Sequence, residues 1–396
     1  MHIGSREVRI NPKSFATIGR QTPYLAWAEK GLTPGAIKAR VIATLQPHFE
    51  NSSVLSDLSI EVLSFEAVLI DRLSSDPWAA AMFAGVLSEY RGALNQDQRK
   101  CLDALTAWDE QIAHAMSEFY SMYLVEADKA GLELDEFRVE LLRNIGGLLE
   151  ACVQPNLKAL LHQVRIRRAK SAHKAHLENL KFGEVVEELS RTLCVPDLLA
   201  PPPWALKVHV LRNIAQHHSA FSRGGRIVAN YRTGQRKVQI EFTKEELLEV
   251  ARKLNQVQGI LRAARTIFYL DNAGEIQNPW GSDLRPDVSI LFLTAAIASQ
   301  GFEAVDLNIS DTLAHLQVRD VTGGDARDRG IHASQFLIQV WVACRTPKVQ
   351  VTYIDKDGRV RLLAEAKNSD CEDVANGRTP FEVLASRVVF RVPSVC

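Results

Sequence analysis

The chain has 396 residues, of which 46% are hydrophobic and 24% are charged, and its formal net charge is zero. This composition is that of an ordinary globular protein with two or three domains, and the neutral total gives no sign of a polyanionic partner. The six cysteines are widely spaced and form no C-x-x-C pair, which argues against a structural zinc site and against a disulfide framework.

Residues 1–130 are predicted to form an N-terminal helical region. Asp76-Pro77 is typical of a helix start and is followed by an apolar stripe that includes Phe83 and Leu87. A second stripe with helical spacing runs from Leu102 to Met116. This region carries no cluster of chemically reactive side chains.

Residues 131–271 are predicted to form a second helical domain. Apolar stripes indicate helices near 137–149, 157–164 and 182–189, and Pro155 is expected to interrupt the first two. A fourth helix is expected over Trp204–Phe221, ended by the Gly224-Gly225 pair.

A hairpin and a last helix complete this domain. The β-type runs Arg226–Tyr231 and Lys237–Phe242 are separated by Thr233-Gly234, which predicts a hairpin. Thr243 to Glu246 has the form of a capping box. The helix that follows is expected to bury one apolar stripe: Leu247, Val250, Leu254, Val257 and Leu261.

Residues 287–396 are predicted to form a smaller α+β domain with an antiparallel sheet. Strands are expected over Ser334–Arg345, Val349–Ile354, Val360–Ala364 and Val388–Val392. The fold class is therefore mainly α, with a central helical bundle, an N-terminal helical region and a C-terminal α+β part.

The neutral total conceals a basic region between Asn156 and Lys237. It holds fifteen basic and five acidic residues, an excess of ten positive charges. Two subclusters are candidates for binding a nucleic-acid backbone. The first is Arg165, Arg167, Arg168, Lys170 and Lys174, and the second is Arg223, Arg226, Arg232, Arg236 and Lys237. The alternative is a solvated helix face and a solvated hairpin.

The basic region contains one polar cluster in a segment of helical spacing. Arg212, Asn213, His217 and His218 lie within seven residues. An imidazole titrates near neutrality and can move a proton, and a guanidinium can stabilise charge on phosphoryl oxygens. One helix does not complete such a site, whereas two copies packed antiparallel would gather two arginines and two histidines. The alternative is a helix end at which these side chains meet only solvent.

The segment from Arg212 to His217 resembles the Arg-x(4–6)-His signature of the HEPN superfamily, whose compact helical domains include many RNases of toxin–antitoxin, CRISPR and anti-phage systems. The segment Lys181–Leu189, the hairpin and the capped last helix are similar in order to that superfamily. The resemblance covers about residues 131–271. Ser219 stands where some of these toxins carry a modifiable tyrosine.

The resemblance implies a homodimer that cleaves RNA without a metal or a cofactor, in toxin or anti-phage systems, with an antitoxin or other regulatory protein as a further partner. It makes His217 the acid–base group, Arg212 the phosphate contact and Asn213 an auxiliary, while His218 is an alternative acid–base group. The rival hypotheses are a non-catalytic module that binds nucleic acid or protein, and a structural dimerisation module.

No metal site and no membrane segment are expected. His173 and His176 lie on a basic helix without a carboxylate or cysteine to complete a metal shell. The longest apolar run, Val288–Ala298, is far shorter than the ~20 residues that span a bilayer. The first residues lack the apolar core of a signal peptide, so we expect a cytoplasmic protein.

Overall fold

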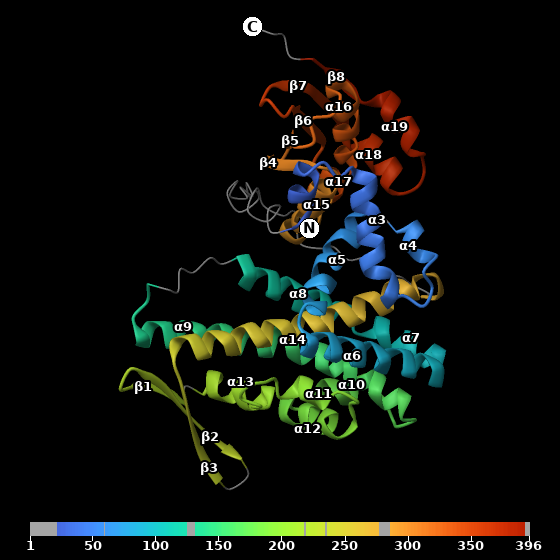
Figure 1. Ribbon diagram of the computed structural model, residues 1–396. Helices are drawn as coiled ribbons and strands as arrows, with labels where there is room; N and C mark the ends of the chain where they lie inside the picture. The colour runs from blue at the N-terminus through green and yellow to red at the C-terminus, as the bar shows by residue number, and fades with distance from the viewer. Residues whose placement is uncertain are drawn as a thin grey trace. The chain divides into compact units, whose positions relative to one another are not determined.

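The structure is a computed structural model that describes residues 22–58, 60–124, 131–217, 219–233, 236–276 and 286–392 (Figure 1). The chain divides into two compact units. Unit 1 draws its residues from Met1–Pro47, Ser53–Val68 and Leu284–Cys396, and unit 2 from His48–Ser52 and Leu69–Asp283. The predicted fold class, mainly α with a smaller α+β part, is confirmed.

Unit 1 combines N-terminal helices with the C-terminal sheet. Its helices and strands are α2 (Tyr24–Glu29), α3 (Pro34–Leu45), α4 (Val54–Asp57), α15 (Pro286–Ser299), β4 (Phe302–Ile309), β5 (Leu313–Asp320), α16 (Ala326–Ser334), α17 (Phe336–Cys344), β6 (Lys348–Ile354), β7 (Val360–Lys367), α18 (Asn368–Ala375), α19 (Phe381–Arg387) and β8 (Val389–Arg391). The short helix η1 (Gln46–His48) and helix α5 (Ile60–Ser74) contribute residues to both units.

The sheet of unit 1 has the order β4-β5-β6-β7-β8 and is mixed, which corrects the antiparallel sheet expected from the sequence. Strands β5 and β6 are parallel because α16 and α17 form the crossover between them. The strand expected over Ser334–Arg345 is wrong, since α17 lies there. The mostly apolar sequence of α17 fits the helical period as well as the strand period. Strands β4 and β5 were not predicted from the sequence.

Unit 2 is a bundle of helices with a three-stranded sheet. Its helices and strands are α6 (Pro77–Gln96), α7 (Gln98–Ala107), α8 (Asp109–Leu124), α9 (Leu134–Gly147), η2 (Leu148–Val153), α10 (Gln154–Arg167), α11 (Lys174–Asn179), α12 (Phe182–Thr192), η3 (Pro196–Leu199), α13 (Val208–Gln216), β1 (Ala220–Arg223), β2 (Arg226–Thr233), β3 (Arg236–Phe242), α14 (Lys244–Asp271) and η4 (Ala273–Glu275).

The compact units differ from the three ranges expected from the sequence. Helix α6, from the expected N-terminal region 1–130, packs against α10 and α14 of the range 131–271. Its apolar face, which includes Val86 and Leu87, is buried there. Helices 69–124 and 131–276 therefore share one core, because an amphipathic helix is stable only where its apolar face is covered.

Both predicted boundaries of the helix at the candidate site are wrong. The helix expected over Trp204–Phe221 is α13, which begins at Val208 and ends at Gln216, and Phe221 lies in strand β1. Gly224 and Gly225 form the turn between β1 and β2, where their φ values of +58° and +75° suit glycine. Antiparallel pairing of β2 with β3 confirms the predicted hairpin.

Helix α14 begins as the sequence predicts. The Thr243 side chain accepts from the Glu246 amide, the Glu246 carboxylate accepts from the Thr243 amide, and all five predicted core residues are buried. In Figure 1, α14 runs along the bundle and the β2–β3 hairpin extends away from the helices of unit 2. None of the helices that the structure describes has the length and apolar character needed to cross a membrane.

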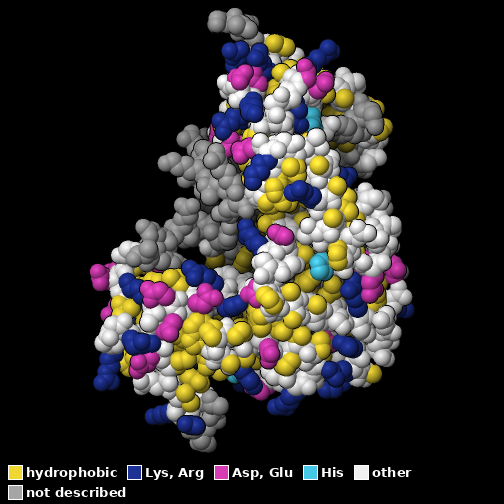
Figure 2. Space-filling view, viewed as in Figure 1, with side chains coloured by type: hydrophobic (Ala, Val, Ile, Leu, Met, Phe, Trp, Pro, Cys, Tyr) yellow, Lys and Arg dark blue, Asp and Glu magenta, His cyan; other side chains and the backbone are white. Residues whose placement is uncertain are grey.

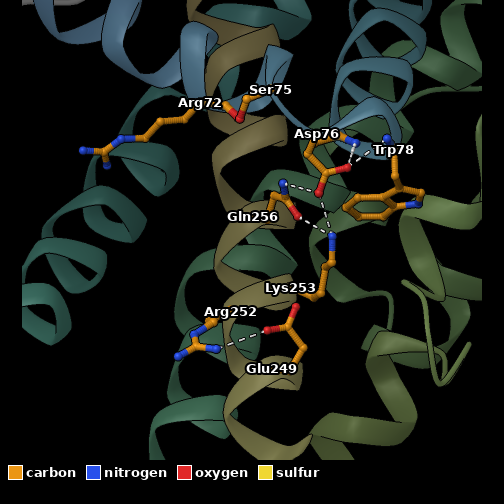
Figure 3. Close-up of polar contacts among 9 residues, drawn as sticks. Arg72, Ser75, Asp76, Trp78, Glu249, Arg252, Lys253 and Gln256 are labelled. Atoms are coloured by element: carbon orange, nitrogen blue, oxygen red, sulfur yellow. Dashed lines mark hydrogen bonds and ion pairs between the residues drawn. The ribbon is translucent and has the colours of Figure 1, made fainter. Parts of the chain in front are cut away.

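A polar cluster joins the start of α6 to α14 (Figure 3). Asp76 caps α6 by accepting from the Trp78 amide at 2.9 Å. Its other oxygen accepts from Lys253 Nζ at 2.8 Å and from Gln256 Nε2 at 3.0 Å. The hydrogen bond from Lys253 is the main cause that lowers the pKa of Asp76 to about 2. The Asp76, Lys253 and Gln256 side chains are thus hydrogen-bonded to one another, so the cluster has a structural role.

We predict that Asp76→Ala lowers the free energy of unfolding by about 1–2 kcal/mol at neutral pH, because it removes a helix cap. The native pKa lies below the ordinary value, so the stabilisation exists above about pH 4 and is lost as the pH falls toward 2. Urea unfolding from neutral pH downward measures both effects. Asp103→Ala, at an exposed residue, is the control, and a difference between wild type and Asp76→Ala that does not shrink in acid would contradict the prediction.

Candidate active site

Helix α13 places the polar cluster at the surface of unit 2. It packs against α9, α12 and η2 through buried Leu211 and Ile214. The opposite side leaves Arg212 half-buried, with 27% of its side chain exposed, and leaves Asn213 and His217 exposed. The three side chains that the resemblance singles out are therefore open to solvent.

Arg212 is held by two neighbours. Its Nε donates to Glu150 Oε2 at 2.6 Å and its Nη2 donates to Glu150 Oε1 at 3.0 Å, so the ion pair is bidentate. Its Nη1 donates to Asn213 Oδ1 at 3.3 Å. These contacts use three of the five N–H groups of the guanidinium. The arrangement fixes the guanidinium and leaves two donors for a further acceptor.

Glu150 reaches Arg212 from an unusual helical segment. Helix α9, the π-helical segment η2 and helix α10 follow one another without a break, and Glu150 lies in η2. Pro155 lies in the first turn of α10, so the expected interruption is instead a change of helical type. Proline cannot donate to the preceding turn, and a π-helical turn is one way in which a helix accommodates this.

The ion pair is charged over the neutral range. The hydrogen bond from Arg212 lowers the pKa of Glu150, and the hydrogen bond to Glu150 raises the pKa of Arg212. A fixed cation with a fixed counter-ion is therefore the resting state of this site in a single chain.

His217 follows the last residue of α13. Its amide donates to the Asn213 carbonyl at 3.0 Å, which places the imidazole at the carboxyl end of the helix. In the described part of the chain, no hydrogen bond joins its ring to Arg212 or Asn213. His218 lies outside the described residues. The structure thus brings Arg212 and Asn213 into contact, with His217 one turn along the chain.

The first basic subcluster is mostly engaged within unit 2. Arg165 makes a bidentate ion pair with Glu188, Arg167 pairs with the buried Glu89 at 2.8 Å, and Arg168 donates to the carbonyl of Thr192. Lys174 pairs with Glu178 and lies over the ring of Trp108. Within the described residues only Lys170 of this subcluster lacks such a partner, so the free basic surface expected here is largely absent.

The second basic subcluster is different. Arg226 pairs with Glu241 and Glu246, at 3.4 and 3.3 Å. The other four residues are exposed and make no ion pair within the described part of the chain: Arg223, Arg232, Arg236 and Lys237. Figure 2 shows Lys and Arg side chains around the projecting end of this hairpin. The unpaired positive charge of the basic region is therefore concentrated on the three-stranded sheet of unit 2.

Glu150 is the site residue that sequence reasoning missed. It is the single charged residue in the otherwise apolar and glycine-containing run Ile145–Val153. A lone carboxylate in such a run is a usable signal that this position faces away from the core, and the Glu150 side chain is indeed 44% exposed. The partner, Arg212, lies 62 residues further along the chain.

Other polar clusters belong to the fold. In unit 1, Asp320 accepts from Arg329 Nη2 at 3.1 Å and from the Thr322 hydroxyl at 2.7 Å, which ties the end of β5 to α16. Among the described residues no group of three or more His, Cys, Asp or Glu side chains is arranged to hold a metal ion. His173 and His176 are exposed.

Comparison with known proteins assigns no family to this chain, since no protein-family model, no curated protein and no solved structure matches it. The residues of the site itself are therefore the basis for a functional assignment.

We predict that Glu150→Gln lowers the free energy of unfolding by about 0.5–1 kcal/mol at neutral pH, the range of a partly exposed ion pair. The native pKa of Glu150 is depressed, so this stabilisation is present above its ordinary pKa and disappears as the pH falls. Thermal unfolding at several pH values measures the effect. Glu140→Gln, which breaks a single contact with the exposed Arg143, should change stability less. Equal stability of Glu150→Gln and wild type at neutral pH would show that the pair contributes nothing.

Proposed function

We propose that this chain is a metal-independent endoribonuclease of the HEPN type, with its active site at the end of α13. The observation that carries the proposal is the arrangement of three solvent-accessible groups on one helix end: a guanidinium fixed by Glu150 and Asn213, the Asn213 amide, and the His217 imidazole. This combination provides a phosphate contact and a proton-transfer group without a metal ion.

The chemistry is cleavage of RNA by its own 2′-hydroxyl. The imidazole of His217 accepts the proton of the 2′-hydroxyl, or donates a proton to the departing 5′-oxygen, while the 2′-oxygen forms a bond to phosphorus and the 5′-oxygen leaves. The two free N–H donors of Arg212 stabilise charge on the phosphoryl oxygens. His218 remains the alternative acid–base group.

The complete site needs a second copy of the chain. Two α13 helices packed antiparallel across a two-fold axis would supply one Arg212 and one His217 to each side of a shared cleft. We therefore propose a cytoplasmic homodimer. A role in a toxin–antitoxin or anti-phage system, with a regulatory protein as partner, is supported only by the resemblance to the HEPN superfamily.

A second candidate function is a non-catalytic module that binds nucleic acid. It is favoured by the four exposed hairpin cations that have no ion-pair partner among the described residues. The two candidates differ in whether the bound RNA is cleaved.

We predict that the purified protein cleaves total RNA in the presence of EDTA, and that Arg212→Ala and His217→Ala each reduce the rate by about 10²-fold or more, because each removes a group acting in the transition state. Gel electrophoresis of the RNA measures cleavage, and melting temperature reports folding. His176→Ala removes another exposed imidazole of unit 2 and should leave cleavage unchanged. Cleavage that needs a divalent metal, or that persists in both variants, contradicts the proposal.

A further inference from the structure

The three-stranded sheet of unit 2 has two different faces. The inner face includes Ala220, Ile227 and Phe242, which are buried against α9, α13 and α14 around a small apolar cavity. Arg138 of α9 anchors the sheet by donating to the Ala220 carbonyl at 2.8 Å. Because side chains alternate along a strand, the residues between these point to the other side.

The outer face of the sheet, defined by the pairing register, combines an aromatic ring, amides and cations with one carboxylate, Glu241, which pairs with Arg226 and accepts from Gln239. Phe221 is paired with Val228, and the same face continues along β2 through Asn230 to Arg232. The exposed residues of this face include Phe221, Arg223, Asn230, Arg232, Lys237 and Gln239. Phe221 has 42% of its surface exposed, so its ring is accessible to a partner.

Two cations on this face are directly opposite each other. Arg232 of β2 is the register partner of Lys237 of β3, and neither has an acidic partner within the described residues. Like charges opposite each other on adjacent strands destabilise a sheet. An anion outside the chain would relieve this repulsion, so the pair is complementary to a phosphate backbone.

We infer that the outer face of the β1–β2–β3 sheet binds single-stranded RNA, with Phe221 stacking on a base and Arg232 and Lys237 contacting phosphates. Arg232 lies four residues beyond the register partner of Phe221, roughly 13 Å along β2, so one extended strand can reach both contacts. Stacking on an exposed ring requires an unpaired base, which favours single strands over duplexes. The identity of the nucleic acid as RNA rests on the proposed ribonuclease function.

The test is fluorescence anisotropy with a labelled RNA of about 12 nucleotides, the size range of single-strand sites. The probe carries 2′-O-methyl riboses, which block attack by the 2′-oxygen, so binding is measured without cleavage on the full-length protein. The same probe annealed to its complement gives the affinity for a duplex.

We predict that the single strand binds more tightly than the duplex, and that Phe221→Ala weakens binding of the single strand about tenfold or more, as loss of one stacked base does. Phe221→Trp restores binding because it restores a stacking surface, and this variant separates stacking from a folding defect. Phe390→Ala is the matched control, since Phe390 is a phenylalanine of unit 1 that is also 42% exposed.

The cations are tested by salt dependence. The double variant Arg232→Gln/Lys237→Gln should reduce the slope of log affinity against log salt by about 1.4, the value expected when two phosphate contacts to a single strand are lost. The control removes two exposed cations from the β6–β7 turn of unit 1, Lys356→Gln/Arg359→Gln, and keeps the slope of wild type.

Two results would overturn the inference: equal or tighter binding of the duplex, or Phe221→Ala binding the single strand as wild type does. Neither depends on cleavage. A protein that binds the methylated probe but never cleaves RNA therefore refutes only the ribonuclease, and one that cleaves RNA but binds the probe equally well without Phe221 refutes only this binding surface.

Discussion

The bidentate ion pair between Glu150 and Arg212 is the constraint on which the candidate site depends. It joins the π-helical segment η2 to α13, two parts of the chain that lie far apart in the sequence. An arginine side chain alone has many rotamers, and two parallel hydrogen bonds to one carboxylate select one of them. The guanidinium is therefore already oriented in the single chain, and the role that we propose for it, electrostatic stabilisation of a phosphoryl group, requires such preorganisation.

The basic residues of unit 2 divide into two groups with different physical roles. Those of α10 and α11 are matched by carboxylates, a carbonyl or an aromatic ring, so they hold helices together. On the three-stranded sheet, Arg226 is paired, whereas four cations have no ion-pair partner in the described part of the chain and remain available to an external anion: Arg223, Arg232, Arg236 and Lys237. The local excess of positive charge is therefore a poor guide to a binding surface until each cation is assigned its neighbour.

Helices and strands were predicted correctly where the apolar residues follow either the helical or the strand period alone, and where a capping residue or a turn marks the boundary of the element. Helix α14 is one example, because the capping box at Thr243 marks where it begins. The β2–β3 hairpin is another, because the alternating side-chain pattern of β2 fits only a strand. Prediction failed for α17, where an apolar run fits two periods, and for the end of α13, where strand β1 begins within a few residues. Arg212 and Asn213 were proposed from their types and spacing, and the structure places their side chains in contact. Glu150 was not, because a long-range ion pair leaves no periodic signal.

The charge balance of the site also bears on assembly. Two copies of α13 packed antiparallel would bring two guanidinium groups into one cleft, and unpaired they would repel each other across a partly dry interface. In each copy of the chain, Glu150 is the counter-ion of Arg212, so each half of the proposed cleft is locally neutral at physiological pH. Glu150, which orients the proposed phosphate contact, would thus also remove the main electrostatic obstacle to the proposed dimerisation. In the proposed function, RNA would then have to be attracted by other charges, and the exposed cations of the three-stranded sheet, on the same unit, are available for this.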